Sequence, residues 1–517
     1  MYNRLKIYAC RYQKIWLFSF VTMLAAFGYM LTTPALTIDE ETWILQEGYN
    51  NLWLLQGRPG IYLLNLIYTE YGRFVPFFAE ALSLLLWSIA GFLLAGILFY
   101  DYLKEEKDGS RFALFTFCAY FNTLPFVVGE SMAFSMMTVQ EYIGLLFVIP
   151  AILLTIHHAE SEIKKKSLVL AALSALTFAV SCYQALIGIY VTAIIALCLL
   201  FYEKKKSCKK LIIYSVALCI ATVGVQFVLN RAIGMVIGTG GYLTDNYIGW
   251  GDGIGYALFM ALANVIRVLF AIPIQGEYIY GGGVIRVITI AFIIDTVFRM
   301  VKEKGAKRKL GTFFFSAALA ASPFFLYIAM GTYKTHGRVL LALALSGAVE
   351  LVLILRDIRP GFWKKAAKVA VILVILANIS NMNRIYYYES LVYEYDVKTA
   401  DTVMYDIERE GLDYHSKPVA FVGMREMDVL PIQKSGTLGG SFFSWDDGNE
   451  KRMIDFIKTR GYVLIQPTGE QMAAAAEYSG QMNCWPMDGS ILETDQMIIV
   501  KFSEPTEKWY ITNNVVN

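Results

Sequence analysis

Three consecutive acidic residues, Asp39, Glu40 and Glu41, follow the first long apolar run of the sequence. Acidic side chains are favoured in the first turn of a helix, and Pro34 and Thr37 just before them are typical of a helix start. A carboxylate at this point can also act as a general base that takes the proton from an attacking hydroxyl group. The pattern therefore predicts either a solvated helix start or a catalytic base at Asp39, with Glu40 as the alternate.

Three basic residues are candidate partners for a negatively charged leaving group. They are Arg58 in "QGRPG", and Lys334 and Arg338 in "GTYKTHGRVL". A phosphate departs as an anion, so it needs a neighbouring cation rather than an acid. The planar Arg guanidinium suits phosphate because it donates two parallel hydrogen bonds. The alternative is that each long side chain only reaches from the membrane to the interface. We predict that all three bind a donor phosphate.

Polar residues at the tips of predicted short hairpins are candidates for holding a sugar. They are Glu130 in "VVGESMAF", and Tyr183 with Gln184 in "SCYQAL". Binding sites for small molecules combine apolar and aromatic walls with a few well-placed polar groups. Aromatic residues, 15% of this chain, also form belts at membrane interfaces, which explains most of them. We predict that Glu130, Tyr183 and Gln184 contact the sugar or the acceptor.

Histidine and cysteine are too few or too scattered for several other chemistries. The chain has four His and seven Cys, with no CxxC or mixed Cys/His spacing. This disfavours zinc sites and acyl transfer that needs several histidines, and it suggests no disulfide framework. A divalent metal ion is compatible with acids and a phosphate on one face, but the sequence does not require a metal.

The composition indicates what kind of scaffold must carry these residues. Of 517 residues, 56% are hydrophobic and 17% are charged, and the mean hydropathy is +0.49. Soluble proteins are less apolar. A bilayer requires about 20 apolar residues per helix and pairing of every backbone polar group, so repeated apolar runs predict a polytopic α-helical membrane protein. The net charge of +2 gives no reason to expect nucleic-acid binding.

The apolar runs locate the predicted membrane helices. The run at 167–201 could by length be one steeply tilted helix. Because lysine clusters at 164–166 and 203–210 flank it on both sides, the positive-inside rule instead predicts a hairpin turning near 181–184. Counting this run twice, the sequence predicts about eleven spans, with the N-terminus inside and the C-terminus outside. The runs are 15–36, 79–100, 112–129, 139–156, 167–201, 211–234, 284–301, 310–330, 338–355 and 367–382.

Three segments are predicted on the outer side. The loops 37–78 and 239–283 combine apolar or amphipathic stretches with Gly-rich breakers, typical of helices and loops on a membrane surface. Towards the C-terminus, β-like pieces such as "PVAFVGM", "YVLIQPT" and "MIIVKF" alternate with helical ones. We therefore predict a transmembrane domain, 1–386, and a small extracytoplasmic α/β domain, 387–517.

Several of these motifs together resemble a known family. The acids after the first span, with "WLLQGRPGIYLLNLIY", "NTLPFVVGESMAF" and "SCYQALIGIYVTA", resemble the type II serotype-converting glucosyltransferases of bacterial surface polysaccharides. The resemblance covers most of the membrane part. It implies a C-type membrane glycosyltransferase fold and transfer of a sugar from a polyprenyl-phosphate carrier outside the cytoplasm. It also implies that Asp39 or Glu40 matches the family's base, Arg58 its "GR", and Tyr183 with Gln184 its "YQ".

The chain departs from the family pattern at one point. The family carries an acid shortly after the outer tip of the third span, where this chain reads "FSMMTVQEY" without Asp. Glu130 or Glu141 is the candidate replacement.

These features together predict an enzyme, a polyprenyl-phosphate-sugar-dependent hexosyltransferase. It would move a hexose, with glucose favoured by the resemblance, from undecaprenyl phosphate to a cell-surface glycan at the outer face of a bacterial plasma membrane. The expected partners are the lipid-linked donor, the glycan acceptor, membrane lipid and, in the same pathway, a donor-synthesising glycosyltransferase and a flippase.

Two alternatives remain. A transporter or flippase of lipid-linked sugars would place polar residues at the bilayer midplane and often shows internal repeats, whereas the ionisable residues here lie mainly at span ends. A non-catalytic scaffold for polysaccharide assembly would leave the outer acids and bases free to vary.

Overall fold

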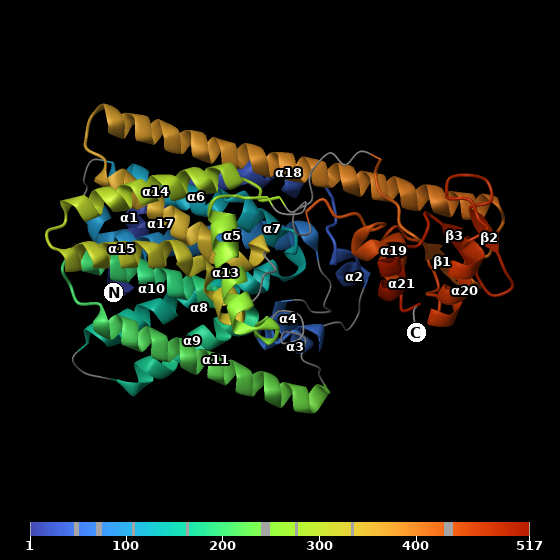
Figure 1. The fold of residues 1–517 in the computed structure, drawn as a ribbon, viewed down its shortest axis with the longest axis horizontal. Coiled ribbons are helices and arrows are strands. Elements are labelled where there is room, and N and C mark those ends of the chain that lie inside the picture. Colours follow the sequence, from blue (N-terminus) through green and yellow to red (C-terminus); the bar gives the residue numbers. More distant parts are fainter. Residues whose placement is uncertain are drawn as a thin grey trace. The chain divides into compact units, whose positions relative to one another are not determined.

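The protein is described by a computed structural model (Figure 1), which covers residues 2–45, 51–68, 75–105, 109–161, 165–238, 249–273, 278–331, 336–428 and 438–515. Its contacts divide the chain into two compact units. Unit 1 comprises residues 1–31, 48–72 and 77–383, and unit 2 comprises 32–47, 73–76 and 384–517. The segment that carries the three consecutive acids therefore groups with the C-terminal residues. The functional division at 386/387 stays a prediction.

Unit 1 is a bundle of helices. Within the described residues, eight helical stretches are long and apolar enough to cross a membrane. They consist of α1 (Tyr2–Thr32), α5 (Pro76–Lys104), α6 (Ser110–Thr123) with η1 (Pro125–Gly129) and α7 (Glu130–Met132), α8 (Ser135–Glu160), α10 (Leu186–Glu203), α11 (Lys209–Ile237), α15 (Ala306–Ala321) with η3 (Ser322–Phe324) and α16 (Phe325–Met330), and η4 (Gly337–Leu340) with α17 (Leu341–Asp357).

The three other predicted spans also fall on helices, namely α9 (Lys166–Cys182), α14 (Gly282–Lys302) and α18 (Phe362–Arg409). The predicted hairpin turn is confirmed, because α9 ends at Cys182 and α10 begins at Leu186. The number of eleven spans and their orientation stay predictions.

The burial of the helices shows which of them form the core of the bundle. In the most apolar window of each stretch, the buried share is 89% for the stretch that contains α6 and 83% for the stretch that contains α17. The same share is only 28% for α1 and for α11. Helix α17 packs against α6, α10 and α14, and α8 packs along α9. Apolar side chains such as Ile220 and Phe227 remain exposed on α11. Such a face suits lipid, since bilayer tails are as apolar as the side chains.

The predicted outer loops contain short helices. In the first loop α2 (Glu40–Leu45) belongs to unit 2, whereas α3 (Asn51–Leu55) and α4 (Pro59–Tyr68) belong to unit 1. The "GRPG" motif ends one helix and begins the next, as predicted. The second loop holds η2 (Trp250–Asp252) and α13 (Ile254–Leu269), while residues 239–248 and 274–277 lie outside the described part.

The C-terminal part of unit 2 contains a small sheet and short helices (Figure 1). Its strands are ordered β1-β3-β2, with β1 parallel and β2 antiparallel to β3. In register, Val419 pairs with Ile498 and Ile491 pairs with Val500. The elements are β1 (Val419–Val422), η5 (Trp445–Asp447), α19 (Glu450–Thr459), α20 (Gly469–Ser479), β2 (Ile491–Glu493), β3 (Ile498–Lys501) and α21 (Glu507–Thr512).

Two of the three predicted strand pieces are confirmed, "PVAFVGM" as β1 and "MIIVKF" as β3. The third, "YVLIQPT" (462–468), is wrong as a strand. Its Leu464 packs into the core while Val463 and Ile465 are exposed, but the segment pairs with none of the three strands of the sheet.

Candidate functional site

Two arginines and two glutamates of unit 1 form a cluster of charges. Arg58 Nη1 lies 3.8 Å from Glu141 Oε1 of α8, and Arg338 Nη1 of η4 lies 3.6 Å from Glu130 Oε1 of α7. Tyr183 links the two pairs: Arg58 stacks 4.8 Å from the centre of its ring, and its hydroxyl donates to the Arg338 carbonyl oxygen at 3.3 Å. Four residues predicted from the sequence therefore lie together with Glu141.

The turn between α3 and α4 fixes Arg58. Gly57 adopts the left-handed φ of 69° that this turn requires, and the Arg58 N–H donates to Trp53 O at 2.7 Å. The side-chain amides of Gln184 and Gln226 both donate to the Gly57 carbonyl oxygen, at 3.0 and 3.1 Å. Gln184, predicted to contact sugar, thus holds the turn that carries Arg58.

The position of Arg338 is fixed through the contacts of its neighbour Gly337. The Gly337 N–H donates to Glu130 Oε2 at 2.8 Å. A Cβ at Gly337 would lie 1.8 Å from Phe126 O, so the contact requires glycine. The Arg338 guanidinium stacks 4.1 Å from the ring centre of Phe134. Glu130, predicted to contact sugar, therefore positions the Arg338 segment.

The cluster combines buried acids with partly open arginines. The side chains of Glu130 and Glu141 are 2% and 1% exposed, whereas those of Arg58 and Arg338 are 16% and 19% exposed. A buried carboxylate that stays ionised requires nearby positive charge, because desolvation is costly. Both Arg–Glu distances exceed that of a hydrogen bond, and Arg58 Nη1 donates instead to Met137 Sδ at 3.0 Å. Sulfur is a weak acceptor, so Arg58 keeps strong donor capacity for an oxyanion.

The predicted base residues lie in unit 2. The Asp39 side chain is 45% exposed, and its Oδ1 accepts from Arg452 Nη2 of α19 at 2.9 Å. Glu40 is 2% exposed, and its carboxylate accepts the Thr37 N–H at 3.0 Å. Of the two candidates, Asp39 is the one that solvent reaches, and Glu40 caps the start of α2.

Glu41, beside them, is almost fully buried and ion-paired with Arg452. Burial raises the pKa of Glu41 from 4.5 to about 7, with a further upward contribution from Asp39, although Arg452 acts in the opposite direction. Arg452 was not predicted from the sequence. Its neighbours in sequence are those of an ordinary amphipathic helix, and a contact with residues more than 400 positions earlier leaves no local pattern.

Lys334 lies outside the described residues, so the predicted pairing of Lys334 with Arg338 stays a prediction. Within the described residues, no group of three or more His, Cys, Asp or Glu side chains is placed to hold a metal ion.

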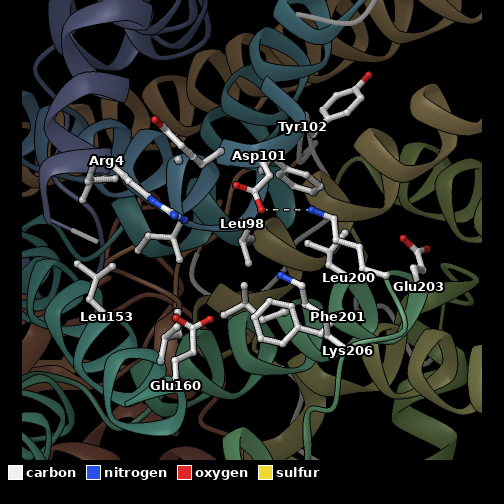
Figure 2. A pocket seen from close by; sticks show the side chains of 18 of the residues that line it. Arg4, Leu98, Asp101, Tyr102, Leu153, Glu160, Leu200, Phe201, Glu203 and Lys206 are labelled. Atoms are coloured by element: carbon white, nitrogen blue, oxygen red, sulfur yellow. Dashed lines mark hydrogen bonds and ion pairs between the residues drawn. The ribbon is translucent and has the colours of Figure 1, made fainter. Parts of the chain in front are cut away.

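A separate cavity of about 440 Å³ in unit 1 shares no residue with these groups (Figure 2). It combines apolar walls, such as Leu200 and Phe201, with charges of both signs, and Asp101 pairs with Lys204 at 3.3 Å across it. Its acids and bases compensate one another, so the cavity indicates no single ligand charge.

Comparisons with known proteins bear on the membrane part of the chain. A family model described as "Glucosyl transferase GtrII" matches residues 28–335. No curated protein and no solved structure matches the chain. The matched range contains Asp39, Arg58, Glu130, Glu141 and Tyr183.

Proposed function

Since the chain belongs to the GtrII glucosyl transferase family, we propose that this membrane glycosyltransferase moves a hexose, favouring glucose, from undecaprenyl phosphate to a cell-surface glycan. In the proposed reaction the acceptor oxygen bonds to the anomeric carbon and gives its proton to Asp39. The bond between that carbon and the phosphate oxygen breaks with inversion, and undecaprenyl phosphate leaves with the electron pair.

The observation that supports this reaction is the Arg58, Arg338, Glu130 and Glu141 cluster. A phosphate leaving group develops negative charge, and two positioned guanidinium groups stabilise it. Glu130 and Glu141 lie 3.6 and 3.8 Å from these guanidinium groups and balance their charge. In this proposal the two glutamates position the arginines, and Lys334 adds a third cation.

Tyr183 and Gln184 have supporting roles in the same proposal. Tyr183 carries Arg58 on its ring face, and Gln184 fixes the turn before Arg58. The sugar contact predicted for Tyr183, Gln184 and Glu130 stays part of this proposal. A divalent metal ion stays optional in this mechanism, because the arginines already supply positive charge.

The proposed setting is the bacterial plasma membrane, with the reaction and the C-terminal domain on the extracytoplasmic side. The donor then comes from a donor-synthesising glycosyltransferase and a flippase of the same pathway. The hydrophobic helices support a multi-pass membrane protein.

The test uses purified full-length protein in detergent with undecaprenyl-phosphate-[¹⁴C]glucose and a crude surface-glycan acceptor. Acceptor-dependent release of undecaprenyl phosphate is expected from the wild type. Arg58→Gln should lower kcat/KM by about 100-fold or more, as removal of one charge-stabilising donor does, whereas Arg58→Lys should retain part of the rate. Lys204→Gln, which removes a half-exposed cation elsewhere in unit 1, should leave the rate unchanged.

Equal rates for wild type and a folded Arg58→Gln variant would contradict the phosphate-binding role. An inactive wild type, tested also with other lipid-linked hexoses, would contradict transfer itself. The flippase alternative would then be measured as movement of a fluorescent lipid-linked sugar across liposomes.

A further inference from the structure

A single arginine of the C-terminal domain gathers the acids that follow the first span. Arg452, in the first turn of α19, donates to Asp39 Oδ1 at 2.9 Å, to Asp446 Oδ2 at 3.2 Å and, through Nη1, to Glu41 Oε1. Its side chain is only 12% exposed. All four residues belong to unit 2, although Asp39 and Arg452 lie 413 positions apart in the sequence.

The surrounding packing gives this contact a defined geometry. Helix α2 packs against α19, and Ile38 beside Asp39 is fully buried in the core that contains Phe456. The side chain of Asn449 caps α19 by accepting the Arg452 N–H at 3.1 Å, which fixes the backbone from which the guanidinium extends. The acidic segment is thus anchored through an apolar contact on one side of Asp39 and an ion pair at Glu41 on the other.

Asp39 itself has an unusual backbone conformation. Its φ of 81° lies in the left-handed region, which is uncommon for residues other than glycine. Such a conformation persists when neighbouring contacts over-determine it. Asp446, the third acid on Arg452, is also left-handed, with a φ of 52°. Two strained acidic residues therefore meet at one guanidinium.

We propose that Arg452 is a positioning residue for sugar transfer, which holds the strained Asp39 carboxylate in the orientation it needs as the base. This inference rests on the proposed function, in which Asp39 accepts the acceptor proton. It assigns a role to the C-terminal domain: supplying the cation that orders the acidic segment after the first span.

The arrangement of the bonds fits this role. Arg452 engages Oδ1 of Asp39, and within the described residues Oδ2 accepts no hydrogen bond. That oxygen can therefore accept the proton of an attacking hydroxyl while Oδ1 stays fixed. Nη2 donates to both Asp39 and Asp446 while Nη1 donates to Glu41, so a planar side chain with several donors is required. A lysine in its place offers only a point charge.

The experiment compares Arg452→Gln and Arg452→Lys with a matched control, Arg460→Gln, in the full-length protein. Arg460 lies at the end of the same helix and forms a partly exposed ion pair with Asp401 at 3.4 Å. Arg452→Gln should lower kcat by about tenfold with little change in donor KM, Arg452→Lys should recover part of the loss, and Arg460→Gln should behave as wild type. Asp39→Asn should lower kcat by about 100-fold, as loss of a general base does.

A double variant separates positioning from general stability. If Arg452 acts through Asp39, then Asp39→Asn with Arg452→Gln should be no slower than Asp39→Asn alone. Hydrogen exchange of amides 36–45, a readout that requires no activity, should become faster in Arg452→Gln and stay at the wild-type rate in Arg460→Gln.

Each other outcome overturns the inference. Unchanged exchange at 36–45 in Arg452→Gln would show that Arg452 does not hold the segment. Faster exchange with an unchanged kcat, or with losses that multiply in the double variant, would show that the holding is structural only. An inactive wild type would overturn both proposals at the level of catalysis, and the exchange data would then report whether the physical contact exists.

Discussion

At the scale of single residues, the two arginines Arg58 and Arg452 differ in how their charges are compensated. Arg58 faces one glutamate at 3.8 Å and a methionine sulfur, and it retains strong donor capacity. Arg452 is hydrogen-bonded to three carboxylates and is more deeply surrounded by negative charge. The surroundings of Arg58 suit the binding of a transient anion, whereas those of Arg452 suit holding acidic side chains permanently in place.

Glu41 gives a pH prediction at this scale. Because its folded-state pKa is about 7 against an ordinary 4.5, the folded protein binds the Glu41 proton more tightly than the unfolded chain does. Stability should therefore fall as pH rises from about 4.5 to about 7 and level off above, by about 3 kcal/mol from this group. Glu41→Gln should remove that part of the pH dependence.

The measurement is the melting temperature in detergent from pH 4.5 to 8.5, taken as the difference between Glu41→Gln and wild type. Glu477→Gln, at an exposed position on α20, is the control. A difference between Glu41→Gln and wild type that does not vary with pH would contradict the prediction.

At the scale of elements, two glycines set how closely the helices that carry the arginines approach their neighbours. A Cβ at Gly60 of α4 would lie 2.5 Å from Ser181 Oγ and 2.7 Å from the Cys182 backbone N, at the end of α9. This approach brings Arg58 to Tyr183. The corresponding contact of Gly337 with Phe126 brings Arg338 to Glu130.

Gly337→Ala should accordingly displace η4 from η1. Since the obstructing atom is a backbone oxygen at 1.8 Å, no side-chain rotation can relieve the overlap, and we expect a loss of about 1–3 kcal/mol of stability together with reduced transfer. Gly188→Ala is the control, because its Cβ would meet only Ala342 at an ordinary 3.6 Å. Thermal melting and the transfer assay measure both effects, and equal behaviour of the two variants would refute the packing argument.

At the scale of the whole molecule, residues next to the first span are part of the core of the C-terminal unit. Ile38 is fully buried among Val403, Phe421 and Phe456, and Leu36 packs against the same cluster. The chain thus contributes to one core from both ends of its sequence. Truncating the C-terminal residues would expose this apolar surface near the first span as well as removing Arg452.

Ile38→Ala should destabilise unit 2 by about 2–5 kcal/mol, because it removes buried volume that the core cannot refill. Faster hydrogen exchange is expected in β1 and β3 although both strands lie more than 370 positions away in the sequence. Leu63→Ala, at a position that is 52% exposed on α4, should leave that exchange unchanged. Unchanged exchange in β1 and β3 of Ile38→Ala would show that the first segment is dispensable for this core.

The sequence alone determined the helical membrane architecture, the break at "GRPG", the turn after Cys182, the positions of β1 and β3, and the resemblance to the family to which the chain belongs. These features depend on local hydrophobicity, turn residues and short motifs, which can be read over a few tens of residues. It also singled out Arg58, Glu130, Tyr183, Gln184 and Arg338 as a group of candidates.

Only the tertiary structure decided which charge meets which. It brings Glu141 to Arg58, turns Glu130 and Gln184 towards the backbone, and joins Asp39 to Arg452 across 413 positions. The strand expected at "YVLIQPT" failed for the same reason, since a β-like composition forms a strand only where a neighbouring strand offers hydrogen bonds. Pairing of distant side chains depends on packing between elements, and no local pattern encodes that packing.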